Sequence, residues 1–132
     1  MTNIVVIAPP STDEGLHEVG KRIIDAALEL GITLTPEGFL YSWVSGTRVI
    51  AVEDENKKIT SLALMTYGKR WTDDDSVATI LRIEGSEVEE LLRFCATLAT
   101  GLGANYLVYE IDPTKRLTDK EEMHFVRRME LT

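Results

Sequence analysis

The stretch Lys69-Arg70-Trp71 combines two cationic side chains with a large aromatic ring. A guanidinium beside an indole can stack on a nucleic-acid base or hold an acidic partner protein. Arg70 and Trp71 are therefore candidate interface residues, unless Trp71 only folds onto the core edge at the end of a strand. Tyr41 and Trp43 pose the same question, because aromatic residues mark protein interfaces but also fill satellite clusters of a core.

The other reactive residue types lack the spacing that their chemistry needs. Asp73 to Asp75 are consecutive carboxylates that point in different directions, which favours a solvated turn over a magnesium or calcium cage. His17 and His124 have no ligand-spaced neighbour, so the sequence predicts no metal site. Cys95 stands in an apolar helical stretch and is expected to be a small buried side chain.

The net charge of the chain limits the kinds of molecule that it is expected to bind. The 132 residues include 22 acidic and 14 basic side chains, for a net charge of −8. Such a surface repels the nucleic-acid backbone, so direct nucleic-acid binding is not expected. The acidity either serves solubility, attracts a basic protein or imitates DNA.

Composition also bears on compartment and domain count. One unpaired cysteine fits a reducing compartment, and we expect a cytoplasmic protein. No stretch approaches the ~20 apolar residues of a membrane span. The absence of repeats and linkers predicts one domain over residues 1–132, and the oligomeric state stays open.

Hydrophobic periodicity predicts the elements of the first half of the chain. Branched residues over 3–8 predict a strand, and Ser11-x-x-Glu14 is typical of a capping box that opens a helix over 12–30. Residues 33–46 fit either a short helix or an extended segment. Three further strands over 47–84 form an antiparallel meander.

The second half adds a strand–helix–strand unit. A second capping box, Ser86-x-x-Glu89, opens a helix over 86–102, and an apolar strand follows at 105–111. The strands at 76–83 and 105–111 are expected to be parallel neighbours. Residues 124–131 form either an edge strand or a short helix. The predicted fold class is α+β, a mixed but mainly antiparallel sheet flanked by helices.

This order of elements, over about residues 12–111, resembles the GNAT family of acyl-CoA-dependent N-acetyltransferases. The hairpin at 47–67, the strand at 76–83, the helix at 86–102 and the strand at 105–111 are similar to that family's central elements. The chain most resembles the shortened GNAT-like proteins that occur in bacteriophage genomes. The resemblance implies acetyl-CoA as a cofactor and a loop with the pattern Arg/Gln-x-x-Gly-x-Gly/Ala that holds its pyrophosphate.

In this chain the loop is degenerate. Arg82, Gly85 and Ser86 are the candidate cofactor-binding residues, but the second glycine of the pattern is absent. Four carboxylates crowd the predicted start of the helix, at positions 84, 87, 89 and 90. They would repel a pyrophosphate and already complement the helix dipole.

Three functional hypotheses follow. The leading one is a non-catalytic GNAT-like protein that binds another protein and has no cofactor, with a role in the virion or against the host if a phage encodes it. The second is an N-acetyltransferase that uses acetyl-CoA, and the third is an acidic inhibitor that imitates DNA.

Overall fold

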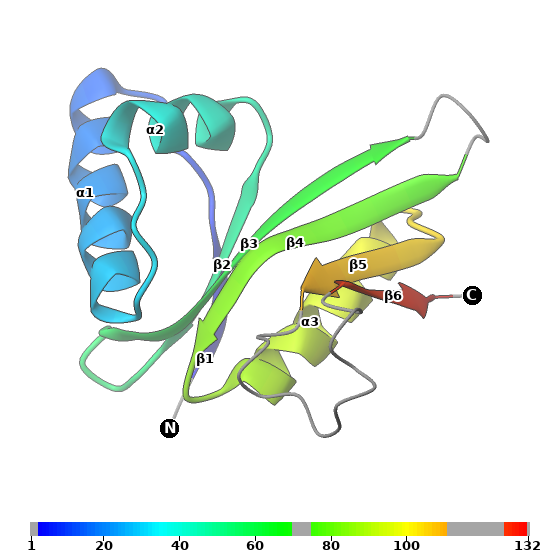
Figure 1. The fold of residues 1–132 in the computed structure, drawn as a ribbon. Coiled ribbons are helices and arrows are strands. Elements are labelled where there is room, and N and C mark those ends of the chain that lie inside the picture. The colour runs from blue at the N-terminus through cyan, green and yellow to red at the C-terminus, as the bar shows by residue number, and fades with distance from the viewer. Residues whose placement is uncertain (1–2, 70–74, 111–125, 132) are drawn as a thin grey trace.

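A computed structural model describes residues 3–69, 75–110 and 126–131 of the chain. Figure 1 shows its elements, which run β1 (Asn3–Ile7), α1 (Asp13–Glu29), α2 (Pro36–Val44), β2 (Arg48–Glu53), β3 (Ile59–Lys69), β4 (Ser76–Gly85), α3 (Val88–Gly101), β5 (Tyr106–Glu110) and β6 (Val126–Glu130). The strands form one six-stranded sheet in the order β1-β2-β3-β4-β5-β6. Only β4 and β5 are parallel, and the other neighbours are antiparallel. The predicted α+β class and the parallel strand–helix–strand unit are confirmed.

The helices cover opposite faces of the sheet (Figure 1). Alternate residues of each central strand enter two separate clusters, because successive side chains of a strand point to opposite faces. Ile23 of α1 and Trp43 of α2 pack with Leu62 of β3 on one face. Leu91 and Cys95 of α3 pack on the other face. The two layers therefore each have their own hydrophobic core.

Both predicted capping boxes are wrong by one residue. The N-cap of α1 is Thr12, whose hydroxyl accepts a hydrogen bond from the Gly15 amide at 3.1 Å. The N-cap of α3 is Glu87, and its side chain makes no cap hydrogen bond. Ser86 instead donates its hydroxyl proton to the Glu87 carboxylate. That carboxylate also accepts from Ser61 of β3, so it is bound to the sheet rather than to its own helix.

The structure settles both segments that the sequence left open. Residues 36–44 form α2, which begins at Pro36, a residue whose fixed φ suits the first turn of a helix. The indole of Trp43 stacks on Phe39 with 5.4 Å between ring centroids and donates to the Ile7 carbonyl at 3.0 Å. Near the C-terminus, Val126–Glu130 is an edge strand antiparallel to β5.

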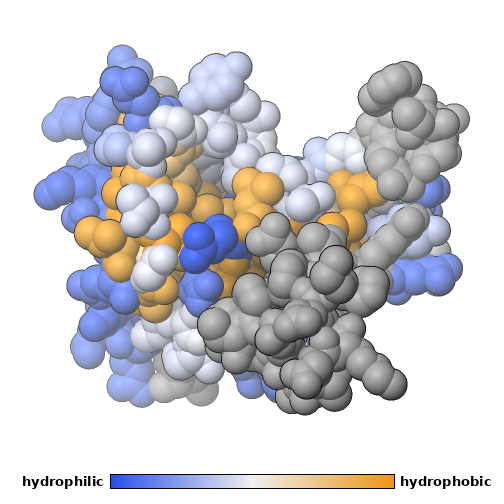
Figure 2. All heavy atoms as spheres, viewed as in Figure 1, coloured by the Kyte–Doolittle hydropathy of each residue, from blue (hydrophilic) through white to orange (hydrophobic). Residues whose placement is uncertain are grey.

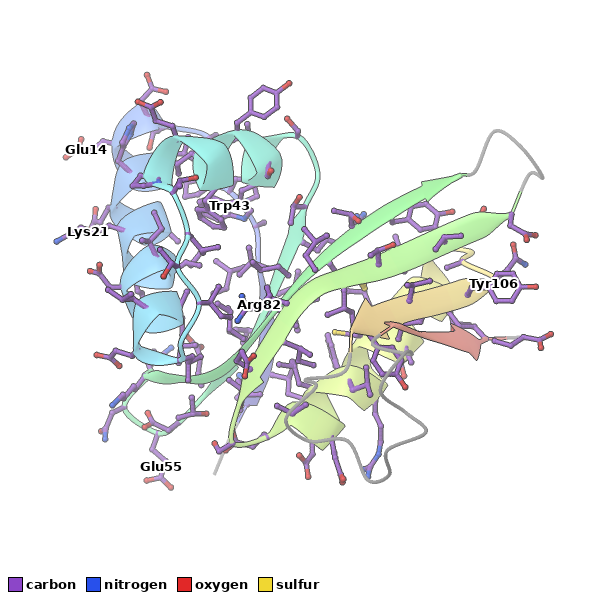
Figure 3. All side chains as sticks on the ribbon, in the orientation of Figure 1. Glu14, Lys21, Trp43, Glu55, Arg82 and Tyr106 are labelled. Atoms are coloured by element: carbon purple, nitrogen blue, oxygen red, sulfur yellow. The ribbon has the colours of Figure 1, made fainter. Side chains whose placement is uncertain are left out.

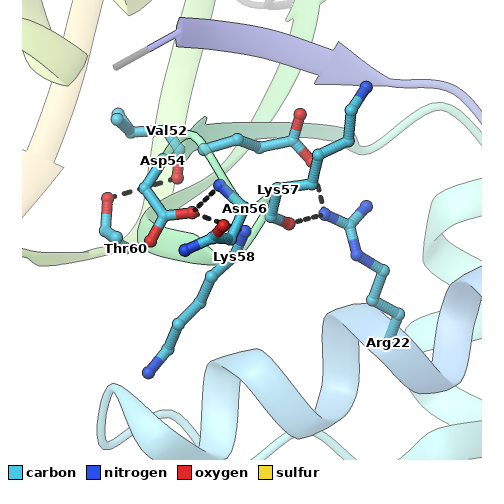
Figure 4. A network of polar contacts seen from close by, with 8 residues as sticks. Arg22, Val52, Asp54, Asn56, Lys57, Lys58 and Thr60 are labelled. Carbon is cyan, nitrogen blue, oxygen red and sulfur yellow. Dashed lines mark hydrogen bonds and ion pairs between the residues drawn. The ribbon is translucent and has the colours of Figure 1, made fainter. Parts of the chain in front are cut away.

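A polar network fastens α1 to the turn between β2 and β3 (Figure 4). Asp54 accepts from the amides of Asn56 at 2.8 Å and Lys58 at 3.0 Å, which fixes the turn. Arg22 of α1 pairs with Glu53 and donates to a carbonyl of the same turn. No helix in the described part of the chain is long and apolar enough to cross a bilayer.

Candidate functional site

The candidate cofactor site is the turn from β4 to α3. Since β4 ends at Gly85 and α3 begins at Val88, the connection consists of Ser86 and Glu87 alone. A pyrophosphate-binding turn needs free backbone N–H groups at a helix N-terminus and room for the phosphate oxygens. The hydrogen bonds of these two residues show whether the turn's own amides are free to bind a phosphate.

The amides of the turn are directed at β3. The Ser86 amide donates to the Thr60 carbonyl at 3.4 Å, and the Glu87 amide donates to the Ser61 hydroxyl at 2.8 Å. These bonds extend the pairing of β4 with β3 into the turn. Both amides are therefore already used within the protein.

The Glu87 carboxylate folds back into a cluster of hydroxyl groups. One of its oxygens, Oε2, accepts from Ser86 at 2.6 Å and from the buried Ser61 at 2.7 Å. The Thr60 hydroxyl lies 3.0 Å from the same oxygen and 3.3 Å from the Val52 carbonyl, so its single proton serves one of the two. An ionised acceptor makes the stronger hydrogen bond.

These bonds fix the charge of Glu87. The hydroxyl of Ser86, followed by that of Ser61, lowers the pKa of Glu87 below its ordinary value, because both stabilise the ionised form. A negative charge therefore sits at the N-terminus of α3 near neutral pH, where it complements the helix dipole. An incoming phosphate would meet this charge in the place that the dipole otherwise offers to an anion.

Gly85 has a structural reason to be glycine. Its φ is +133°, a region that side chains rarely adopt, and it pairs with Ser61 across the β3–β4 ladder. A Cβ atom on Gly85 would lie 2.5 Å from the Cβ of Ser61 and closer still to its Cα and Oγ atoms. The close approach of two strands explains this glycine without a ligand.

Arg82 lies on the other face of the sheet from α3. It is paired with Leu64 of β3, whose side chain belongs to the cluster under α1 and α2, and Figure 3 shows it on the α1 side of the sheet. Its Nη2 atom is 3.5 Å from both a Glu84 carboxylate oxygen and the Gly31 carbonyl. The structure therefore places Arg82 on one face and the Ser86 turn at the α3 side, and does not join them in one anion site.

The strand β4 pairs with the described part of β5 over only part of its length. Residues Val77–Ile80 of β4 pair with β5. On the other side of β4, its register with β3 shifts after Ile80. Met65 of β3 faces Ile80 while Leu64 faces Arg82, so Leu81 is an extra residue in β4 that forms a bulge. Among the described residues, the part of β4 after this bulge pairs with β3 alone.

The structure divides the predicted interface residues. Trp43 is only 1% exposed and bound into the core, so its prediction as an interface residue is wrong. Its indole fills the space between α2 and the sheet, which the aromatic composition could not reveal. Tyr41, on the same helix, is 75% exposed and is available to a partner. Arg70 and Trp71 lie outside the described residues.

Cys95 lies in the interior, as the sequence predicts. Cys95 is buried, and burial raises the pKa of its thiol to about 12. His17 is exposed, with its Nδ1 atom 2.8 Å from the Asp13 carbonyl of its own helix. The described residues contain no group of three His, Cys, Asp or Glu side chains that could hold a metal ion. Residues 73, 74 and 124 lie outside the described part of the chain.

Sequence reasoning missed the hydroxyl cluster around Glu87. The predicted repulsion treated all four glutamates alike, whereas only Glu87 is drawn into the turn by Thr60 and Ser61. A signal was present, because Glu87 occupies the second glycine position of the family pattern. Its partners are 26 and 27 residues away in the chain, and only the β3–β4 register brings them there.

Solved structures resemble this chain over most of its length. A GNAT family acetyltransferase from Staphylococcus aureus matches with a TM-score of 0.60 and 12% identity, over 88% of this chain and 93% of that one. A ribosomal-protein-alanine N-acetyltransferase from Brucella melitensis biovar Abortus 2308 matches with a TM-score of 0.64 and 6% identity, over 87% and 83%. An aminoglycoside acetyltransferase from an uncultured soil sample matches with a TM-score of 0.62 and 14% identity, over 86% and 80%.

The sequence itself matches no protein-family model and no curated protein. The likeness is therefore one of backbone and element order, at identities where a shared fold does not carry a shared activity. The predicted resemblance is confirmed at this level: the chain has a GNAT-like fold.

Proposed function

We propose that this chain is a GNAT-fold protein that acts by binding another protein and does not transfer an acyl group from coenzyme A. The observation that carries the proposal is the Glu87 turn, where the chain's own carboxylate and amides are bonded to β3. A coenzyme pyrophosphate would have to displace those bonds. It would also meet an ionised carboxylate, and each such like-charge contact costs about 1–4 kcal/mol.

The surface supports a protein partner. Large hydrophobic side chains are exposed on α1, α2 and β4, namely Leu28, Tyr41, Val44 and Leu81. Figure 2 shows hydrophobic residues at the surface on the side of the sheet that α1 and α2 cover. With a net charge of −8, the chain favours a basic partner. We place this role in the cytoplasm, or in the virion or against host proteins if a phage encodes the chain.

The second candidate is an N-acetyltransferase, and the limited described pairing of β4 with β5 favours it. After Ile80, β4 has no described pairing with β5. A strand edge of this kind offers backbone donors and acceptors to an extended ligand, such as the pantetheine arm of acetyl-CoA. The acetyltransferases among the solved structures of similar fold are consistent with this candidate.

The structure counts against the DNA-mimic hypothesis. An inhibitor of that kind presents its carboxylates on one face. The described acidic residues include Asp13 and Glu14 at the start of α1 and Glu89 and Glu90 at the start of α3. Since α1 and α3 cover opposite faces of the sheet, these four described carboxylates do not share one face.

Isothermal titration calorimetry with acetyl-CoA separates the two candidates. We expect no binding heat at millimolar ligand, because the pyrophosphate position is occupied and negatively charged. Micromolar affinity would overturn the proposal and establish the transferase candidate in its place. The titration uses the full chain, and a thermal melt of the same sample shows that the protein is folded.

Tyr41→Ala tests the surface expected to bind a partner. The expected result is weaker recovery of a captured protein from the cell that makes this chain, compared with Thr97→Ala, an exposed control on α3 at the opposite face of the sheet. Equal recovery by Tyr41→Ala and the unmodified protein would remove α2 from the interface.

A further inference from the structure

The outer edge of β1 pairs with no other described strand, since β1 is the first strand of the sheet and pairs with β2 alone. At the end of this edge, the Ile7 carbonyl accepts a hydrogen bond from the indole of Trp43. Its sequence, Asn3–Ile7, contains no charged residue. The five residue pairs with β2 run without a register shift, so no bulge twists the edge away. An edge of this kind presents backbone donors and acceptors to another strand.

The opposite edge of the sheet is different in kind. The last strand, β6, carries Arg127, Arg128 and Glu130 among its five residues. Charged residues on an edge strand are a common device against pairing with another chain. Among the described strands, one edge of the sheet therefore carries charged residues and the other carries none.

We infer that β1 pairs with β1 of a second copy of this chain, antiparallel across a two-fold axis, and joins two sheets into one. With Val5 on the axis, Ile4 faces Val6 of the second copy, and Asn3 faces its Ile7. No facing pair brings like charges together, whereas antiparallel pairing of two β6 strands would set charged residues against one another. Each copy has one such edge, so the assembly closes as a dimer.

The exposure of Val6 supports this partner. Val6 is 44% exposed although it stands in a strand. It faces Ile50 of β2 in the ladder, and Ile50 belongs to the cluster under α3, so Val6 lies on the α3 side of the sheet. In the proposed register, Ile4 of the second copy covers Val6 as a cross-strand neighbour on that face.

Charge gives the dimer a distinctive response to salt. Each copy carries a net charge of −8, so two copies repel one another at long range. Salt screens that repulsion, and the dimer is therefore expected to tighten as ionic strength rises. A complex with a basic partner would respond in the opposite way.

Size-exclusion chromatography with light scattering, at increasing protein and salt concentrations, tests the inference. We expect a dimer for the unmodified chain and at least a tenfold weaker dimer for Val6→Lys, which puts a cation at the pairing edge. Leu81→Lys is the matched control, because Leu81 is 46% exposed in β4, which β2 and β3 separate from β1. A monomer at every concentration, or a Val6→Lys dimer as tight as the control, overturns the inference.

A second variant allows the same test if Val6→Lys does not fold. Asn3→Lys changes an exposed residue at the end of β1, and circular dichroism shows which variants are folded. If Val6→Lys does not fold, Asn3→Lys carries the comparison with the same two outcomes.

Discussion

Gly85→Ala separates a structural glycine from a ligand-binding one. If Gly85 is present to let a cofactor approach, the alanine variant folds normally and loses only binding. If it is present because β3 and β4 approach closely, the variant is destabilised with no ligand involved. The structure supports the second account, since the space that a Cβ needs is occupied by Ser61.

Two independent costs add in this variant. Holding alanine at a φ of +133° costs about 1–3 kcal/mol, because that region is essentially restricted to glycine. Overlap of the new Cβ with the backbone and side chain of Ser61 costs about 1–3 kcal/mol more through displacement of the strands. We therefore expect a loss of at least ~2 kcal/mol, which lowers Tm by roughly 6 °C or more for a domain of this size.

Thermal unfolding followed by circular dichroism measures this loss. Gly101→Ala is the matched control, because no atom lies within 4 Å of its added Cβ and its φ is not positive. The control is expected to be neutral or slightly stabilising. A Tm for Gly85→Ala within about 2 °C of the unmodified protein, less than 1 kcal/mol by the same scaling, would refute the reasoning about this turn.

Three further predictions follow from named contacts. Glu87→Gln is expected to lose about 1 kcal/mol at pH 7, because neutral acceptors bind hydroxyls more weakly. Since the pKa of Glu87 is lowered in the folded protein, this stabilisation is present above the ordinary value of 4.5 and is lost as the pH falls through the pKa of the folded state. Urea unfolding of the variant and the unmodified protein at pH 7 and at lower pH measures this loss. A stability difference between the two proteins that does not change with pH would contradict the prediction. Trp43→Phe removes the hydrogen bond to Ile7 and is expected to cost about 1 kcal/mol in the same assay, so unchanged stability would show that this bond contributes nothing. Cys95, with its pKa raised to about 12 by burial, is expected to react with a thiol reagent only after unfolding, and rapid labelling of the native protein would contradict its burial.

The local hydrophobic pattern was sufficient to predict most of the helices and strands. The boundaries of β1 and α1 agree with the predicted ranges 3–8 and 12–30 within about a residue, because both elements pack apolar side chains against the core. Residues 36–44 could not be assigned, since their few apolar side chains fit a helix and an extended segment alike. The helical form follows from the packing of Trp43 between α2 and β1.

The same distinction between local sequence and tertiary packing applies to the candidate site. The sequence by itself determined that the loop lacks a second glycine and that acidic residues surround it, since both are matters of residue type and order. Only the tertiary structure decided that Glu87 turns inward onto Thr60 and Ser61, while Arg82 lies on the opposite face. The reason is the register of β3 against β4, which beside this turn pairs residues more than twenty positions apart, such as Ser61 and Gly85, and cannot be obtained from the spacing of either strand alone.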